Sequence, residues 1–209
     1  MSRATRSSQA AARRITPLLV LLACALPAGS AQAAAYHDHD NLAQATIEQD
    51  GGRAFDFAWS ISKQRGGTVD QSNKAHAAGR CTECEATAIA FQIVLVSGAP
   101  SKVAPTNEGV ALNLECPRCE VFAAARQFVR VYEKPVRLTV AGRRELANVR
   151  NTLHALEAQD PPIDQLYLAV EAQEARVRQV LNTELVSRSD PSEEADVIDA
   201  QLAQDTDQG

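Results

Sequence analysis

The sequence lacks the short motifs that mark the common catalytic sites. It contains no HExxH, no GxSxG, no Walker phosphate-binding loop and no GxGxxG. Acidic side chains are plentiful but scattered, and none of their spacings requires the paired carboxylates of general acid–base catalysis. The motifs therefore give no support for an enzyme, although an active site assembled from scattered residues is compatible with them.

Long apolar runs are also scarce. AIAFQIVLV at 88–96 is only nine residues long, whereas a helix needs about 20 apolar residues to cross a bilayer. The longer run ITPLLVLLACALPAG follows a segment with four arginines and precedes Ala31-Gln32-Ala33, a layout typical of a secretory signal peptide. We therefore expect residues 1–33 to be a cleaved signal peptide and the protein to be secreted or extracytoplasmic, without stable membrane insertion. Lipidation at Cys24 is the alternative.

Positive charge is scarce once this segment is removed. Subtracting its four arginines from 21 Lys and Arg leaves 17 against 26 Asp and Glu, a net charge of −9. Such an acidic protein is poorly suited to nucleic acid, so we expect no nucleic-acid partner. Residues 188–209 hold seven acids, one arginine and few large apolar side chains. This composition predicts an acidic disordered tail.

The middle of the chain has the alternation of half-buried strands. FDFAWSIS at 55–62 places aromatic and aliphatic side chains on one face, and Gly66-Gly67 then marks a turn. We expect TVDQSNKAHA at 68–77 to return beside it as an antiparallel hairpin. Further strands are predicted at 88–96, where a buried helix is the alternative, and at 110–114 and 136–140. The segment 101–109 is predicted to be a loop.

Helices are predicted in the later part of the chain. EVFAAARQFVRVY at 120–132 has an apolar stripe and begins beside a proline suited to a first helical turn. Two further amphipathic segments, 143–158 and 163–186, flank Asp160-Pro161-Pro162 and predict an αα-hairpin. These C-terminal helices could also contact an unknown protein partner.

The expected fold is therefore α+β, with a mainly antiparallel sheet of four to five strands, a CxxC-capped helix and a C-terminal αα-hairpin. We expect five regions along the chain. They are the signal peptide (1–33), a flexible N-terminal segment (34–52), a double-CxxC α+β domain (53–158), a C-terminal helix that completes the hairpin (159–187) and the acidic tail (188–209).

Two Cys-x-x-Cys pairs, CTEC at 81–84 and CPRC at 116–119, carry the candidate site. Two such pairs have the general pattern of a four-cysteine zinc site, with Cys81, Cys84, Cys116 and Cys119 as ligands. The strand–CPRC–helix order instead suggests thiol–disulfide exchange by Cys116 and Cys119, because a helix N-terminus favours a thiolate. Four neighbouring glutamates oppose that ionisation.

Structural disulfides among Cys81, Cys84, Cys116 and Cys119 are the interpretation that export favours, since oxidation is allowed outside the cytoplasm. We then expect no cofactor, with zinc as the alternative. Closing a four-residue loop restricts the unfolded chain by roughly 1.9 kcal/mol, whereas a loop of about 36 residues gives roughly 3.8 kcal/mol. Stability therefore favours bridges between the two pairs over bridges within them.

Three segments also carry a family resemblance: DQSNKAHAAGRCTECEATAIAFQIVLVSG, PTNEGVALNLECPRCEVFAAARQFV and VRLTVAGRRELANVR. Together they resemble a double-CxxC module near the C-terminus of actinobacterial proteins named as peptide zinc metalloproteases, and of related small exported proteins. The resemblance covers about residues 50–155. It implies an extracytoplasmic module of unknown biochemical role in which the four cysteines are the matching positions. No catalytic residue carries over, because the HExxH of the longer proteins is absent.

Overall fold

The computed structural model describes residues 40–188. The predicted signal peptide, Cys24, nearly all of the predicted acidic tail and part of the predicted N-terminal segment lie outside this range. The described elements, in chain order, are β1 (Asn41–Ile47), β2 (Arg53–Val69), β3 (Ser72–Gly79), β4 (Glu85–Val103), β5 (Thr106–Asn113), β6 (Glu120–Tyr132), β7 (Val136–Leu138), α1 (Val140–His154), α2 (Leu156–Gln159), α3 (Ile163–Thr183) and β8 (Leu185–Ser187).

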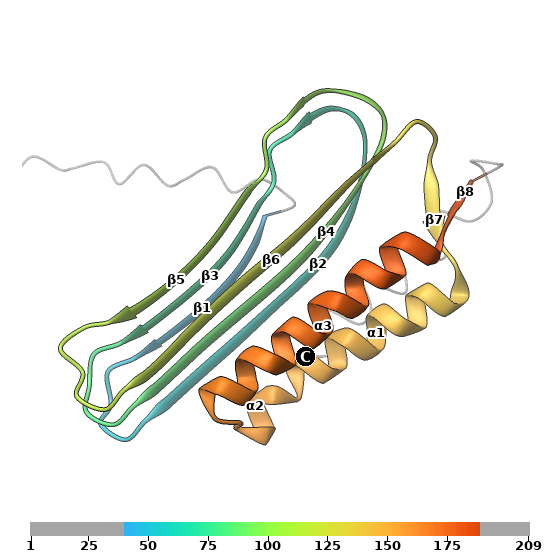
Figure 1. Ribbon diagram of the computed structural model, residues 1–209. Helices are drawn as coiled ribbons and strands as arrows, with labels where there is room; N and C mark the ends of the chain where they lie inside the picture. The colour runs from blue at the N-terminus through green and yellow to red at the C-terminus, as the bar shows by residue number, and fades with distance from the viewer. Residues whose placement is uncertain (1–39, 189–209) are drawn as a thin grey trace, which may run out of the picture. The chain divides into compact units, whose positions relative to one another are not determined.

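Two parallel sheets form the larger part of the described structure. One has the strand order β1-β3-β5 and the other β2-β4-β6. The chain passes from a strand of the first sheet to a strand of the second and back again, so it winds through three coils, at residues 41–69, 72–103 and 106–132. Figure 1 shows the two sheets lying face to face, with the helices beyond the second sheet. The arrangement is a short parallel β-solenoid.

The prediction of a mainly antiparallel sheet is wrong. Strand β2 pairs in parallel with β4, one coil later, and the residues after Gly67 do not fold back on it. Gly66 and Gly67 both have positive φ, and they lie at an irregularity within β2. Among described residues, only β7 and β8 form an antiparallel pair. Alternation fixes which face of a strand is buried, but it does not identify the neighbouring strand.

The predicted helix at 120–132 is also wrong, because these residues form strand β6 beside β4. The helix was predicted from an apolar stripe and a neighbouring proline, and the run Ala123-Ala124-Ala125 is compatible with a helix because alanine is the best helix former. In the solenoid, small side chains serve a different purpose. The space between the two sheets is filled by an alanine cluster: Ala43, Ala45, Ala75, Ala77, Ala86, Ala88, Ala90 and Ala125. Methyl groups allow the sheets to approach closely, and tertiary packing overrides helix propensity.

Three of the predicted strands are confirmed, whereas one predicted loop is not. The strands predicted at 55–62, 88–96 and 110–114 lie mostly within β2, β4 and β5. The predicted loop at 101–109 is mostly strand, however, because β4 extends to Val103 and β5 begins at Thr106. The segment 34–52, expected to be flexible, contains strand β1.

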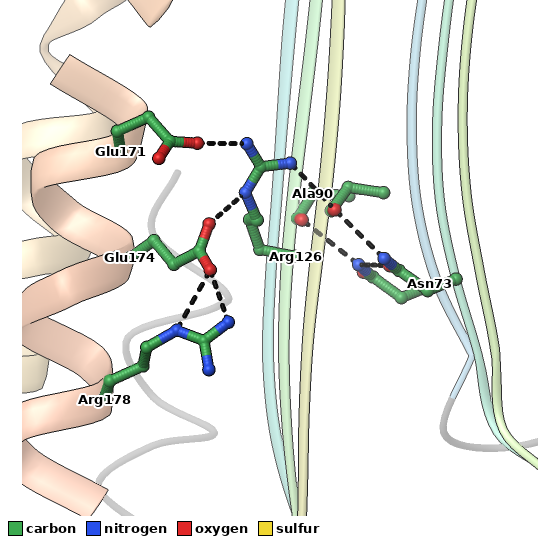
Figure 2. A network of polar contacts seen from close by, with 8 residues as sticks. Asn73, Ala90, Arg126, Glu171, Glu174 and Arg178 are labelled. Atoms are coloured by element: carbon green, nitrogen blue, oxygen red, sulfur yellow. Dashed lines mark hydrogen bonds and ion pairs between the residues drawn. The ribbon is translucent and has the colours of Figure 1, made fainter. Parts of the chain in front are cut away.

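An asparagine ladder crosses the three coils at equivalent positions. The side chain of Asn41 donates to Asn73 Oδ1 (2.8 Å), and Asn73 Nδ2 donates to Asn107 Oδ1 (2.8 Å). The two sheets are tied together as well, since Asn73 Nδ2 also donates to the Ala90 carbonyl (3.2 Å; Figure 2) and Asn107 to that of Ala125 (3.1 Å). Asn73 is fully buried, so these bonds satisfy an amide that is expensive to desolvate.

The outer face of the β2-β4-β6 sheet carries the large apolar side chains. Ile89, Phe91 and Ile93 of β4 are fully buried and belong to one cluster with residues of α1 and α3 such as Val149 and Val170. Phe91 lies between the rings of Trp59 and Phe128, with centroids 5.9 and 6.2 Å away. This cluster is the main core, and β4 is covered on both faces.

The two long helices pack on each other as a hairpin, as the sequence predicts. The side chain of Thr139 caps α1 by accepting from the Gly142 N–H (3.0 Å). Helix α3 is held to β6 by Arg126, which pairs with Glu171 and Glu174 (Figure 2). Arg178 donates to the same Glu174 carboxylate (2.6 and 3.0 Å).

Burial raises the pKa of Glu174, but the hydrogen bonds and charges of Arg178 and Arg126 outweigh it. The pKa of this carboxyl therefore lies below its ordinary value. The ion pairs thus stabilise the packing of α3 on the sheet when Glu174 is ionised.

Candidate functional site

The two CxxC pairs occupy equivalent turns of adjacent coils. CTEC lies between β3 and β4, and CPRC lies between β5 and β6. The strands that leave these turns start in register, because Glu85 pairs with Glu120. Cys84 and Cys119 each precede one of these residues, so the second cysteine of one turn lies beside the second cysteine of the next.

Left-handed backbone shapes both turns. Glu83 has φ 56° and Arg118 has φ 58°, each immediately before the second cysteine of its pair. Residues other than glycine rarely adopt this conformation, because their Cβ atom clashes with the backbone. Gly51 holds the same place in the turn of the first coil, with φ 64°. Two hydrogen bonds join the cysteine turns, from the Glu83 N–H to the Pro117 carbonyl and from the Glu120 N–H to the Cys84 carbonyl (both 3.0 Å).

The four sulfur atoms converge within 4.8 Å of one another. Cys84 Sγ lies 3.3 Å from Cys116 Sγ and 3.0 Å from Cys119 Sγ. In this arrangement the sulfurs within each pair are bonded, Cys81 with Cys84 and Cys116 with Cys119. Bridges from one pair to the other would use the same four sulfurs. That connectivity, which the sequence analysis favours on grounds of stability, stays a prediction.

Burial separates this group from solvent. Cys84 is fully buried, Cys81 and Cys116 are nearly so, and Cys119 is half-buried. Backbone groups surround the sulfurs: the Cys84 N–H donates to Cys119 Sγ (3.2 Å), while Cys81 Sγ approaches the Ile47 carbonyl (3.3 Å). The cluster thus contacts the first coil as well as the second and third.

The arrangement can either form disulfides or hold a metal ion. A tetrahedral zinc site has Zn–S distances of about 2.3 Å, which places its sulfurs about 3.8 Å apart. All four sulfurs lie within 4.8 Å of one another, but those within each pair are bonded rather than held at that spacing. The thiolates of Cys81, Cys84, Cys116 and Cys119 would therefore hold a single ion only with the bonds within both pairs absent. In residues 40–188, this is the one cluster of three or more His, Cys, Asp or Glu side chains suited to a metal.

The third chemistry suggested by the sequence, thiol exchange, loses its structural basis. A CxxC pair gains a reactive thiolate when it lies at a helix N-terminus. CPRC precedes strand β6 rather than a helix. Strands have only a small net dipole, so Cys116 lacks the stabilisation that the predicted helix would have supplied.

Charges flank the cluster without entering it. Arg118 and Glu83 form an ion pair across the two turns, but both side chains are more than half exposed, so the pair contributes little stability. Glu85 lies beside Glu120 and pairs with Arg53. The pKa of Glu85 is raised by burial and then by the charges of Asp160 and Glu120, which outweigh Arg53.

Sequence reasoning missed Gly79, which lies against the sulfurs. A Cβ at this position would be 3.5 Å from Cys84 Sγ, 3.7 Å from Cys116 Sγ and 3.3 Å from a methyl group of Val121. A Cβ would thus make ordinary van der Waals contact with the two sulfurs and a tight contact only with Val121. Only the alignment of the coils, which pairs Gly79 with Asn113, would have indicated this position.

Within the described part of the chain, no helix is long and apolar enough to span a membrane. Comparisons of the chain with protein-family models, with curated proteins and with solved structures find no match.

Proposed function

We propose that this chain is an exported, non-catalytic β-solenoid module stabilised by four cysteines in the adjoining turns of its second and third coils, with a structural or binding role outside the membrane. The observation that carries the proposal is the convergence of four sulfurs from two coils within 4.8 Å. Bridges within the pairs fix the shape of each turn, whereas bridges between the pairs or a shared ion would also link β4 to β6.

Disulfides are the form of cross-link that an exported chain favours. The support is the signal-like layout of residues 1–33 and the even number of cysteines that follow it. Our proposal extends the resemblance to the double-CxxC module, whose matching positions are these same four cysteines.

A non-catalytic role agrees with the surroundings of the cluster. The pocket lined by Arg53, Glu85, Glu120 and Asp160 has a volume of only about 20 Å³. That is space for about one water molecule, whereas ligand pockets measure about 300–1,000 Å³.

A protein partner would most simply contact the outer side of α3. Tyr167 and Leu168 are 52% and 65% exposed there, and Ile163 is 37% exposed. The apolar stripes of α1 and α3 are already buried against the sheet and each other. These three side chains, together with Val140 of α1, are the large apolar groups that the described helices leave exposed.

Intact-mass analysis of the protein purified from a secreting host tests the cross-link. Two disulfides among the four cysteines remove four hydrogens and leave no thiol for alkylation before reduction. Reduction should then lower the free energy of unfolding, by roughly 4 kcal/mol for two local bridges and roughly twice that for bridges between the pairs. A variant with serine at all four positions is the control, and reductant should not change its stability. Four free thiols without bound metal would contradict the proposal.

A zinc-stabilised module is the second candidate, favoured by the convergence of four cysteine sulfurs within 4.8 Å. Cys81, Cys84, Cys116 and Cys119 would hold the ion as thiolates, and zinc would supply folding free energy rather than chemistry. Native mass spectrometry distinguishes the two forms, because a zinc-bound chain is heavier by one ion and becomes alkylatable at all four cysteines once denatured. Chelation would unfold that form and leave a disulfide-linked form unchanged.

A further inference from the structure

The two sheets are staggered, which leaves the last coil partly uncovered. Strand β1 packs over both β2 and β4, and β3 packs over both β4 and β6. Strand β5 contacts β6, but the second sheet ends there, so no strand of residues 40–188 lies beyond β6 to cover the rest of β5. Figure 1 shows β5 and β6 at the same side of the two sheets. The stagger therefore leaves an open strand position beside β6.

Burial of the inward-facing residues shows the same asymmetry. Asn73, Ala75 and Ala77 of β3 lie between the sheets and are buried. The residues paired with them in β5 are exposed: Asn107, Gly109 and Ala111. Gly109 lies over the backbone of β6, since a Cβ there would be 3.5 Å from the Ala123 carbonyl oxygen. Strand β6 thus covers only part of the inner face of β5.

The outer edge of β6 carries backbone groups with which no described strand pairs. The Glu120 N–H donates to the Cys84 carbonyl, so Glu120 faces β4. Successive residues of a strand direct their backbone groups to opposite edges, so those of Ala123 and Ala125 face away from β4. Arg126 Nη1 donates to the Ala125 carbonyl (3.3 Å), in the place of the N–H that a neighbouring strand would supply. Such an edge is a template for an added strand.

Helix packing decides which kind of strand fits beside β6. Neighbouring strands lie about 4.8 Å apart, whereas packed helices need about 8–10 Å between their axes. Helix α3 is held to β6 by Arg126, and α1 contacts β2. A second copy of the chain that placed its β2 beside β6 would bring its α1 about one strand spacing from α3. The two helices would collide, so a single extended segment fits where a second copy does not.

We propose that the outer edge of β6 binds an extended segment of a partner protein, which adds to the sheet as a parallel strand and covers the inner face of β5. Side chains of the segment that face β5 must be small, because alanine fills the space between the sheets. The alternate side chains would lie beside α3, whose exposed Tyr167 is one turn before Glu171, on the side that contacts Arg126. Large apolar residues suit those positions. The inference rests on the binding role proposed above, but it is independent of whether the cysteines form disulfides or hold zinc.

A fluorescently labelled peptide with the sequence of residues 85–93, EATAIAFQI, is the probe. These residues of β4 alternate alanine with larger side chains, and they already lie between two parallel strands. Fluorescence anisotropy measures binding of the peptide to the full chain. The orientation of its backbone follows from β4 itself, where the Glu85 N–H donates to the Gly52 carbonyl and so faces the preceding strand.

Methylation of the peptide nitrogens tests whether binding uses this edge. By the same alternation, the N–H groups of Thr87 and Ile89 in the bound peptide would face β6, and those of Ala88 and Ala90 would face solvent. N-methylation at Thr87 and Ile89 removes two hydrogen bonds and should weaken binding about thirtyfold. N-methylation at Ala88 and Ala90 is the matched control and should leave the affinity unchanged.

Substitutions in β5 test the position of the bound peptide. Ala111→Phe would place a ring in the open position beside β6 and should weaken binding by about tenfold or more. Leu112→Phe places its ring on the opposite face of β5 and should not change binding. Both residues are exposed, and urea unfolding verifies that each variant is folded.

Equal affinity of the two N-methylated peptides, or of the two variants, would overturn strand addition at β6. Absence of binding by the unmodified peptide would overturn it as well. None of these outcomes affects the cysteine cross-link, which the intact mass tests separately.

Discussion

The asparagine ladder gives the sharpest test of the solenoid. Asn73 occupies its centre, fully buried, where it accepts one hydrogen bond from Asn41 and donates two, to Asn107 and to the Ala90 carbonyl. A hydrogen bond contributes about 1 kcal/mol net, and a buried partner left unsatisfied costs about 1–3 kcal/mol. We therefore expect Asn73→Ala to lower the free energy of unfolding by about 3 kcal/mol or more.

The end of the ladder supplies the matched comparison. Asn107 makes one bond with Asn73 and one with Ala125, but it lies on the exposed strand β5. Water can replace the lost bonds there, so Asn107→Ala should cost about 1 kcal/mol. The ladder thus predicts a difference of about 2 kcal/mol between identical substitutions at equivalent positions of neighbouring coils.

Equilibrium unfolding in urea measures both values. Trp59 is the one tryptophan of the sequence, and its ring stacks on Phe91 in the main core, so its fluorescence reports the packing of the sheet. An unchanged m-value would show that the same surface unfolds in each variant. Equal losses for the two substitutions, or a loss below about 1 kcal/mol for Asn73→Ala, would refute the reasoning.

Asn73→Asp separates hydrogen bonding from size. Aspartate keeps the acceptor for Asn41 but places oxygen against the acceptor oxygens of Asn107 and Ala90. Burial disfavours the ionised form and raises the pKa of the new carboxyl. Its folded-state pKa then exceeds the unfolded value, so the variant should regain stability as the pH falls through the folded pKa.

Two further predictions concern the helices. Glu174→Gln should cost about 1–2 kcal/mol at pH 7, because it weakens the charged hydrogen bonds with Arg126 and Arg178. Glu174 has a lowered folded-state pKa, so its contribution is present above the unfolded value of about 4.5 and is lost as the pH falls through the folded pKa. Unfolding of both proteins at several pH values checks this, and a constant difference down to pH 2 would contradict it. Gly142→Ala should destabilise by about 1–3 kcal/mol, because its Cβ would lie 2.7 Å from Glu184 Cβ. In an unobstructed helix the same change gains about 1 kcal/mol, so a rise in melting temperature would disprove the close contact.

The strand and helix positions were more predictable than their arrangement. The alternation of Phe55, Phe57, Trp59 and Ile61 correctly indicated a strand with an apolar face, since these side chains pack against the main core. It could not distinguish a hairpin partner 10 residues away from a parallel partner one coil away, because both present the same pattern. The helix predicted at 120–132 was wrong for a related reason: its apolar stripe and the neighbouring proline are local signals, whereas the narrow space between two sheets is a property of the whole coil.

The repeat was the signal that could have corrected both errors. Asn41, Asn73 and Asn107 pair across the coils at separations of 32 and 34 residues. The second cysteines, Cys84 and Cys119, are 35 residues apart, which is again one coil. That spacing, more than the CxxC motif itself, explains why two turns distant in sequence place their sulfurs together.

The three turns that precede β2, β4 and β6 are held to one another by different contacts, which depend on the residues of each turn. Asp50-Gly51 holds the first turn to the second, since the Thr82 N–H donates to Asp50 Oδ1 (2.8 Å) and the Gly51 N–H donates to the Thr82 carbonyl (2.9 Å). The second and third turns are joined by two backbone hydrogen bonds, and their four sulfurs also converge. Strand β5 is exposed along nearly all of its length, so the third coil buries less surface than the second and gains less from hydrophobic packing. The four sulfurs therefore converge where packing alone holds the solenoid least firmly.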